Sequence, residues 1–241
     1  MSFSISKKVS FVKEKLKTRK ISKSFLTLTF FPIVLPSIQL LLRFHEGEIE
    51  GVFPLLRCFL AIELPESILN RIGEVQRALK SSKADVRWVS PENIHLTLKF
   101  FGNIEEFQIE SIVKSIEEPI RTTSPISIAV QGIGAFPGLK NPRVIWVGLN
   151  DERKELVPFQ NRLERELEKV GFQPEDRPFH PHLTLGRMRS NQGKDELVRG
   201  MERYREEGFG NFQVEGVVLF QSDLTPTGPI YTPLRTFLLG I

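Results

Sequence analysis

Cysteine and histidine are both scarce in this sequence of 241 residues, which has one cysteine and four histidines. The single cysteine, Cys58, excludes an intrachain disulfide and is typical of a reducing compartment, so we expect a cytoplasmic protein. Because Cys58 lies in an apolar, strand-like run, we interpret it as a small buried side chain rather than a nucleophile. There is no cysteine cluster and no His-Glu-x-x-His run, so we expect neither a zinc site nor any other cofactor.

The larger part of the chain lacks an excess of charge of either sign. Residues 1–56 hold nine Lys/Arg against four Asp/Glu, whereas the other 185 residues hold 24 basic and 25 acidic side chains. The formal net charge of +4 therefore originates in the N-terminal segment. Proteins that coat long nucleic acids are strongly basic, so this composition favours a small anionic substrate or the end of an RNA strand.

Residues 1–56 differ from the remainder of the chain. Residues 1–24 are basic, and Phe25–Leu42 is an uncharged run of 18 residues that contains Pro32 and Pro36. This run is at the lower limit for spanning a bilayer, its prolines would break a helix, and no small-residue cleavage site follows it. We expect residues 1–56 to be an extension outside the folded unit that results from an upstream start. A membrane-associating tail and an ordered packing segment are the alternatives.

One motif, His-Leu-Thr-Leu, occurs twice, at His95–Leu98 and at His182–Leu185, with an offset of 87 positions. Polar and apolar residues alternate in each copy, which is typical of a half-buried strand. Because residues i and i+2 of a strand share a face, the histidine and threonine of each copy should lie together. The leucines should face the opposite side, toward a core.

The elements around the two motifs follow the same order twice, which indicates an internal duplication. The first series is expected to have strands over 57–63, 95–102 and 126–131, with one helix from Pro65 and a second over 105–118 that ends at Pro119. The second series is expected to have strands over 143–149, from 182 and over 212–221, with helices over 152–170 and 194–207; a last strand over 231–239 has no counterpart. We therefore predict an α+β fold over residues 57–241. Two β-α-β-α-β lobes would place their sheets around a central cleft and their helices outside.

Two imidazoles that face one another across a cleft suit acid–base chemistry at phosphorus. Histidine has an ordinary pKa of about 6.5, so one ring can accept a proton from water while the other donates one to a leaving oxygen. In-line displacement needs these groups on opposite sides of the phosphate, which two related strands can supply. Thr97 and Thr184 each follow a motif histidine by two residues, and their hydroxyls are expected to hold phosphoryl oxygens.

Arg187 follows the second motif, and its guanidinium is a candidate phosphate ligand. Its odd spacing from His182 would place it on the opposite face of a regular strand. Gly186 is therefore expected to mark a bulge or kink that turns Arg187 into the cleft; a surface arginine is the alternative. His180 shares the face of His182 but has Asn93 as its counterpart in the first series, so we expect it at the rim.

A basic groove beside these residues is a further possibility, although dispersed basic side chains are more often merely solvated. Its members would be Lys83, Arg87, Lys99, Lys140 and Arg143.

In these motifs the sequence resembles the two-histidine phosphoesterase superfamily, which is defined by paired His-x-Thr-x motifs. Within it, the likeness is closest to the RNA 2′,3′-cyclic phosphodiesterases, also described as 2′-5′ RNA ligases. The likeness is carried by RCFLAIELP at 57–65, VRWVSPENIHLTLKFFGN at 86–103, FHPHLTLGR at 179–187 and a C-terminal tail with Ser222, Gly228–Tyr231 and Leu234. It does not extend over residues 1–56, and members of the family usually begin close to the first of these stretches.

The resemblance implies metal-independent hydrolysis of 2′,3′-cyclic phosphate at RNA or nucleoside ends, giving 2′-phosphomonoesters. It implies that His95 donates a proton to the departing 3′ oxygen, that His182 accepts a proton from water, and that Thr97, Thr184 and Arg187 hold the phosphate. Base recognition is expected to use aromatic stacking. The candidates, which are equally consistent with core positions, are Phe59, Trp88, Phe179 and Phe220.

Two other functions remain compatible with the same residues. The reverse reaction, 2′-5′ ligation of RNA ends, would use the same site. A non-catalytic nucleotide or RNA-end binding module would use the histidines only to grip phosphate. In each case the expected partners are RNA ends or nucleotides, with no stable protein partner and a monomeric chain.

Overall fold

The computed structural model describes residues 42–45, 48–51, 54–226 and 228–240. Within the expected N-terminal extension, strands β1 (Leu42–His45) and β2 (Glu48–Gly51) pair antiparallel. The expectation for residues 1–41 lies outside the described residues. Within the described ranges, no helix is both long and apolar enough to cross a membrane.

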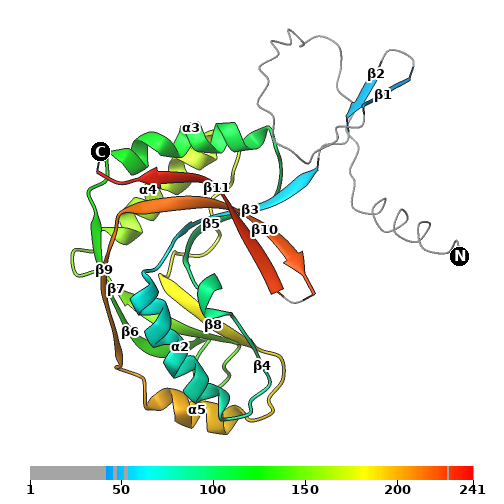
Figure 1. The fold of residues 1–241 in the computed structure, drawn as a ribbon. Helices are drawn as coiled ribbons and strands as arrows, with labels where there is room; N and C mark the ends of the chain where they lie inside the picture. The colour runs from blue at the N-terminus through cyan, green and yellow to red at the C-terminus, as the bar shows by residue number, and fades with distance from the viewer. Residues whose placement is uncertain (1–41, 46–47, 52–53, 227, 241) are drawn as a thin grey trace, which may run out of the picture.

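Two antiparallel sheets form the body of the protein and lie between two pairs of helices (Figure 1), which confirms the predicted α+β class. The four-stranded sheet has the order β11-β10-β3-β5, and the five-stranded sheet has the order β4-β8-β7-β6-β9. The first consists of β3 (Leu55–Ile62), β5 (Leu96–Glu105), β10 (Gly216–Thr225) and β11 (Gly228–Leu238). The second consists of β4 (Val86–Trp88), β6 (Ile126–Phe136), β7 (Val144–Asn150), β8 (His182–Met188) and β9 (Gly208–Val214).

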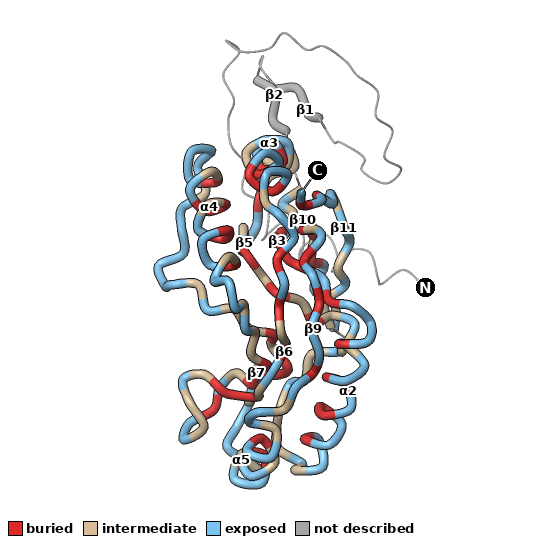
Figure 2. The backbone as a smooth tube through the Cα atoms, turned by 90° about the vertical axis from the view of Figure 1, so that its left-hand side faces the viewer, coloured by how far each residue is buried: buried red, intermediate tan, exposed pale blue. Residues whose placement is uncertain are grey.

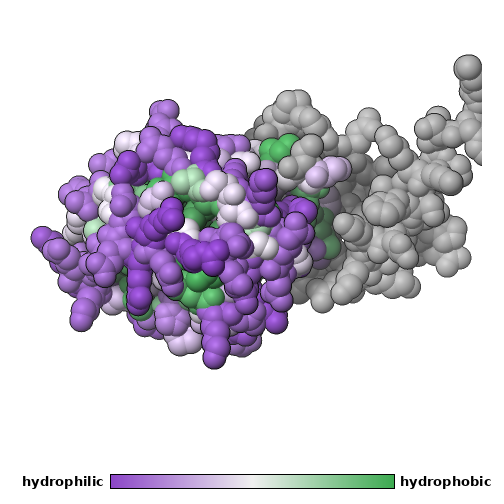
Figure 3. All heavy atoms as spheres, turned by 90° about the horizontal axis from the view of Figure 1, so that it is seen from below, coloured by the Kyte–Doolittle hydropathy of each residue, from purple (hydrophilic) through white to green (hydrophobic). Residues whose placement is uncertain are grey.

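The helices cover the outer faces of the sheets and bury one apolar side each (Figure 2). Helix α2 (Glu66–Lys80) contacts α5 (Lys194–Glu202) and β9, whereas α3 (Gln108–Arg121) contacts α4 (Leu156–Lys169), β5 and β11. The short 3-10 helix η2 (Pro91–Asn93) precedes β5 and contacts α2. Seen from below, most of the described surface is hydrophilic, with hydrophobic patches between the polar side chains (Figure 3).

The lobes are interleaved rather than built from consecutive repeats, which corrects the expected arrangement. Helix α2 links β3 to the β5 region along the chain, yet it packs with α5 on the other sheet. Helix α4 links β7 to β8 but packs with α3 on the four-stranded sheet. The short strand β4 precedes β5 in sequence but pairs with β8. Local periodicity defines each element, but partners that are distant in sequence decide which sheet it joins.

The segment expected to form one strand over 212–221 belongs to two strands in different sheets. Strand β9 pairs with β6, and β10 pairs with β3 and β11. Between them, the carbonyl of Glu215 accepts a hydrogen bond from the N–H of Leu239 at 2.8 Å. A Cβ atom on Gly216 would lie 2.8 Å from the carbonyl oxygen of Phe237, so glycine permits the close backbone approach at this crossing.

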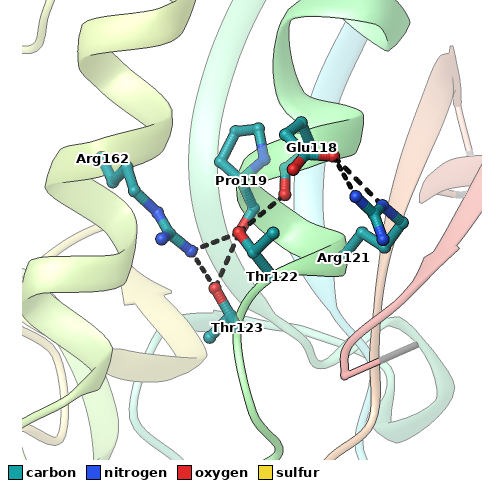
Figure 4. Close-up of polar contacts among 6 residues, drawn as sticks. All are labelled: Glu118, Pro119, Arg121, Thr122, Thr123 and Arg162. Carbon is teal, nitrogen blue, oxygen red and sulfur yellow. Dashed lines mark hydrogen bonds and ion pairs between the residues drawn. The ribbon is translucent and has the colours of Figure 1, made fainter.

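Helix α3 continues through Pro119 to Arg121, so the expectation that Pro119 ends it was wrong (Figure 4). Proline lacks an N–H group and so removes the hydrogen bond to the carbonyl of Ser115, but only the last turn of the helix lies beyond it. The carbonyls there find other donors: the Thr122 hydroxyl donates to Glu118, and the Thr123 hydroxyl and the Arg162 guanidinium both donate to Pro119. Because Arg162 belongs to α4, the same contact joins the two helices.

Candidate active site

A cleft of about 1440 Å³ separates the two sheets and contains all five residues that the sequence singled out. From β5 and the residue before it come His95 and Thr97, and from β8 come His182, Thr184 and Arg187. The leucines of both motifs, Leu96, Leu98, Leu183 and Leu185, face the other way and are at most 3% exposed. The alternation in each motif is thus confirmed.

The two histidine rings are held in the same way. Nδ1 of His95 lies 2.9 Å from the carbonyl oxygen of Asn93, and Nδ1 of His182 lies 2.7 Å from that of His180. A carbonyl oxygen only accepts, so Nδ1 of each ring carries the hydrogen and Nε2 is the atom available for proton transfer. The side chain of His180 is exposed, and its backbone has the role that Asn93 has in the first motif.

The surroundings of the two rings differ, however. His95 stacks on Phe59 with ring centroids 4.7 Å apart, and the Tyr231 ring meets it edge-on at 5.3 Å. Burial disfavours the charged imidazolium, so the pKa of His95 is lowered from 6.5 to about 4, although the hydrogen bond to Asn93 acts in the opposite direction. The ring of His182 meets that of Phe136 edge-on, with the ring centroids 5.0 Å apart.

Both motifs end in a β-bulge at the same position. Neighbouring residues Ile145 and Trp146 of β7 pair with Gly186 and Thr184, so Leu185 is the extra residue of β8. In β5 the neighbours Leu60 and Ala61 of β3 pair with Lys99 and Thr97, so Leu98 is the extra residue there. A one-residue bulge reverses the alternation beyond it.

The bulge in β8 explains how Arg187 reaches the cleft despite its odd spacing from His182. The predicted irregularity is therefore confirmed, but the extra residue is Leu185 rather than Gly186. Glycine is required at position 186 for the close packing of β4, because a Cβ atom there would lie 2.6 Å from Cγ1 of Val86 on that neighbouring strand. In β5 the residue equivalent to Arg187 is Phe100, which lines the cleft and is 54% exposed.

Phe100 was not predicted as a site residue from the sequence. Its only signal in the sequence was its place in the repeat, two residues beyond the end of the first motif. Of the proposed stacking residues, Phe59 and Phe220 are buried and stack on each other at 5.3 Å, while Phe179 and Trp88 are half-buried, and of these two Phe179 lines the cleft. An exposed aromatic ring in a cleft is a better platform for a nucleobase than a buried one.

The expected basic groove exists in part. Arg87 and Arg143 line the cleft, and Arg87 lies directly opposite Arg187 in the β4–β8 pair. Lys99 also lines the cleft, but its ammonium is already paired, 2.7 Å from Glu164 of α4 and 2.6 Å from the carbonyl oxygen of Gln173. Lys83 and Lys140 do not line the cleft. In all, seven basic and three acidic residues line it, so positive charge is concentrated there in a body of balanced composition.

Cys58 is 1% exposed, as expected for a buried side chain, and burial together with Asp223 raises the pKa of its thiol to about 11. A thiol with so high a pKa is a poor nucleophile. Within the described residues, no group of three or more His, Cys, Asp and Glu side chains could hold a metal ion.

Two facing sheets with paired histidines in a basic cleft define a phosphoesterase of the two-histidine class. The chain matches the family described as LigT like Phosphoesterase twice, over residues 62–146 and 147–231, and it belongs to that family. The two matches coincide with the internal duplication.

Relatives of known activity support the same assignment. The RNA 2′,3′-cyclic phosphodiesterase of Methanothermobacter thermautotrophicus is 37% identical over 184 residues, which cover 76% of this chain and 99% of the relative. The enzyme of the same name from Archaeoglobus fulgidus is 38% identical over 183 residues, with 76% and 99% coverage. Among solved structures, E. coli LigT complexed with 3′-AMP superposes with a TM-score of 0.63 at 26% identity, covering 77% of this chain and 98% of that one.

Proposed function

We propose that this protein is an RNA 2′,3′-cyclic phosphodiesterase that opens the terminal cyclic phosphate to a 2′-phosphomonoester, with His95 and His182 as its acid and base. The observation that carries the proposal is the matched pair of imidazoles in one cleft. Each ring commits Nδ1 to a backbone carbonyl and has a threonine two residues further along the same face. The activity named for relatives at 37% and 38% identity supports the same substrate.

In this mechanism, a water oxygen attacks phosphorus while the bond from phosphorus to the 3′ oxygen breaks. Nε2 of His182 accepts a proton from the water, and Nε2 of His95 donates a proton to the departing 3′ oxygen. The charge that develops on the phosphoryl oxygens is held by the hydroxyls of Thr97 and Thr184 and by the guanidinium of Arg187. No metal is required, since protonation neutralises the leaving group.

The cleft also has room and charge for more than one nucleotide. Its volume of about 1440 Å³ and the arginines at positions 87 and 143 suit the phosphate that precedes the terminal nucleotide of an RNA chain. Phe100 offers a ring for the terminal base. We further propose that the protein acts as a monomer, because both sheets and both histidines of the site come from one chain, and that it is cytoplasmic, since a single free cysteine is typical of a reducing compartment.

The direct test is incubation of a dinucleotide ending in 2′,3′-cyclic phosphate with the wild-type protein, with products resolved by ³¹P NMR. We expect conversion to the 2′-phosphomonoester alone, at a rate that a chelator leaves unchanged. Binding without turnover would favour the non-catalytic module. A 2′-5′ linked product that dominates when a 5′-hydroxyl RNA is added would favour ligation.

The titration of His95 provides a second test, because an anion stabilises the protonated ring. In the free protein the pKa of His95 should be about 4, so the ring is neutral near pH 7. Bound phosphate should raise that pKa, so that His95 takes up a proton from solvent and can donate it to the departing 3′ oxygen. NMR titration of ring-labelled protein, with and without inorganic phosphate, measures both values, and a His95→Gln variant identifies the resonance. An unchanged pKa with phosphate bound would contradict the acid role.

A further inference from the structure

Two buried glutamines, Gln76 and Gln160, contact the two β-bulges of the site. Gln76 is 1% exposed and Gln160 is 3% exposed. The side-chain amide of Gln76 donates to the carbonyl of Leu185 at 3.1 Å, and that of Gln160 donates to the carbonyl of Leu98 at 3.1 Å. Each acceptor is therefore the extra residue of a bulge, at the last position of a His-Leu-Thr-Leu motif.

The two contacts cross between the halves of the chain. Gln76 lies on α2, from the first repeat, and holds the motif of the second repeat. Gln160 lies on α4, from the second repeat, and holds the motif of the first. The interleaving of the lobes thus places the same residue type at the same structural position on both sides of the cleft.

Each amide uses its second N–H to fix a further part of the site. Gln76 also donates to the carbonyl of Val89 at 2.6 Å, and the N–H of Val89 donates to Leu185 at 2.8 Å, so one side chain ties β8 to the end of β4. Gln160 also donates to Glu164 at 3.0 Å, the carboxylate that pairs with Lys99. Buried polar groups need such partners, because an unmade hydrogen bond in the interior is unfavourable.

The bulges determine which side chains enter the cleft. Without the extra residue Leu185, the side chain at 187 would face the helices, and without Leu98 the side chain at 100 would do so. The carbonyl at each bulge accepts a hydrogen bond from the amide of a glutamine on a helix, and that of Leu185 also accepts one from the N–H of Val89. Holding that carbonyl therefore holds the local register on which Arg187 and Phe100 depend.

Building on the proposed function, we infer that Gln76 and Gln160 are a symmetry-related pair of positioning residues, which aim Arg187 and Phe100, respectively, at the substrate. Gln76 acts on the phosphate side of the cleft through β8 and β4. Gln160 acts on the opposite side through β5. Gln160 lines the cleft and Gln76 does not, but the amide of each is bound to a bulge carbonyl, so each acts through the residue two positions beyond the bulge.

A pair of double-mutant cycles tests this inference with kcat/KM for the cyclic dinucleotide as the readout. Gln76→Met and Gln160→Met keep the side-chain volume but remove both donors, and each is combined with Arg187→Ala and with Phe100→Ala. Gln213→Met, at an exposed position of β9, is the surface control. Residues that act as one unit have non-additive effects, whereas independent ones add.

We expect Gln76→Met to lower kcat/KM about tenfold in the wild-type background and less than about twofold beside Arg187→Ala, because small misplacements of a binding group have effects of this order. In the Phe100→Ala background, Gln76→Met should still lower kcat/KM about tenfold. Gln160→Met should show the reverse pattern, with coupling to Phe100 and none to Arg187. Each glutamine is thereby a control for the other.

A purely structural role would lower kcat/KM by the same factor in every background, and that result would overturn the inference, as would unchanged kcat/KM in both single variants. Thermal unfolding of every variant verifies that it is folded during the assay. If a methionine variant does not fold, Gln76→Asn or Gln160→Asn replaces it, since asparagine keeps an amide but withdraws it from the bulge, and the same coupling is expected. A wild-type protein that fails to hydrolyse the dinucleotide would instead refute the proposed function.

Discussion

Replacing either His95 or His182 with alanine is expected to lower kcat/KM for a 2′,3′-cyclic dinucleotide by about two to four orders of magnitude, the usual contribution of general acid–base catalysis. Each ring lines the cleft with Nδ1 bound to a backbone carbonyl, which leaves Nε2 for proton transfer. Steady-state assays of the two variants beside the wild-type protein measure the effect.

His180→Ala is the matched control for the histidine variants. Its side chain is exposed, and the group that holds His182 is the backbone carbonyl of residue 180, which alanine retains. We expect its kcat/KM to remain within about threefold of wild type, as for other exposed side chains. Near-wild-type turnover by His95→Ala or His182→Ala would rule out the acid–base mechanism, and binding that survives the loss of turnover would show that the rings act on the reaction rather than on affinity.

Lys99→Met is expected to destabilise the protein by about 3–5 kcal/mol, because it leaves the carboxylate of Glu164 buried without its cation. Lys99 is 5% exposed and Glu164 is 7% exposed, and their charged atoms are 2.7 Å apart. The same substitution removes the donor to the carbonyl of Gln173, at the start of the loop that leads to His182. Urea unfolding followed by circular dichroism gives the change in the free energy of unfolding.

A surface ion pair provides the comparison. Lys114 and Glu110 are 3.4 Å apart on α3, with side chains 73% and 63% exposed, so Lys114→Met should change the stability by less than about 1 kcal/mol. Lys99→Met combined with Glu164→Gln should recover part of the loss, because the uncompensated charge is gone. Equal destabilisation by Lys99→Met and Lys114→Met would contradict this account of the buried pair.

The sequence was sufficient for the class of fold, for most elements and for five residues that line the candidate cleft. Helix α2 shows why: Ile68, Ile72, Val75 and Leu79 recur at helical spacing, and all four are buried. The two His-Leu-Thr-Leu motifs carried a second local signal, because strict alternation determines which side of a strand is buried. Their repetition at a fixed offset was enough to predict that two histidines share one cleft.

The strand pairing partners and the identity of the bulge residues could not be predicted from the local pattern, although Gly186 indicated an irregularity beside Arg187. Nothing in the residues Leu98 and Leu185 distinguishes an extra strand residue from an ordinary one, since both are buried leucines in an alternating run. The consequences were nevertheless large, because the bulges send Lys99 to Glu164 and bring Phe100 and Arg187 into the cleft. A change of register by one residue exchanges the two faces of a strand, and no periodicity of the strand itself records it.

The sequence by itself determined that this chain has duplicated strands with one histidine and one threonine on a shared face, because that information is local and repeats every two residues. Only the tertiary structure decided that helices α2 and α4 each cover the sheet that carries the motif of the other repeat, and that Gln76 and Gln160 meet the bulges across the lobes. The physical reason is that sheet order and helix packing depend on contacts between segments far apart in the chain, and many partners satisfy the same local pattern equally well.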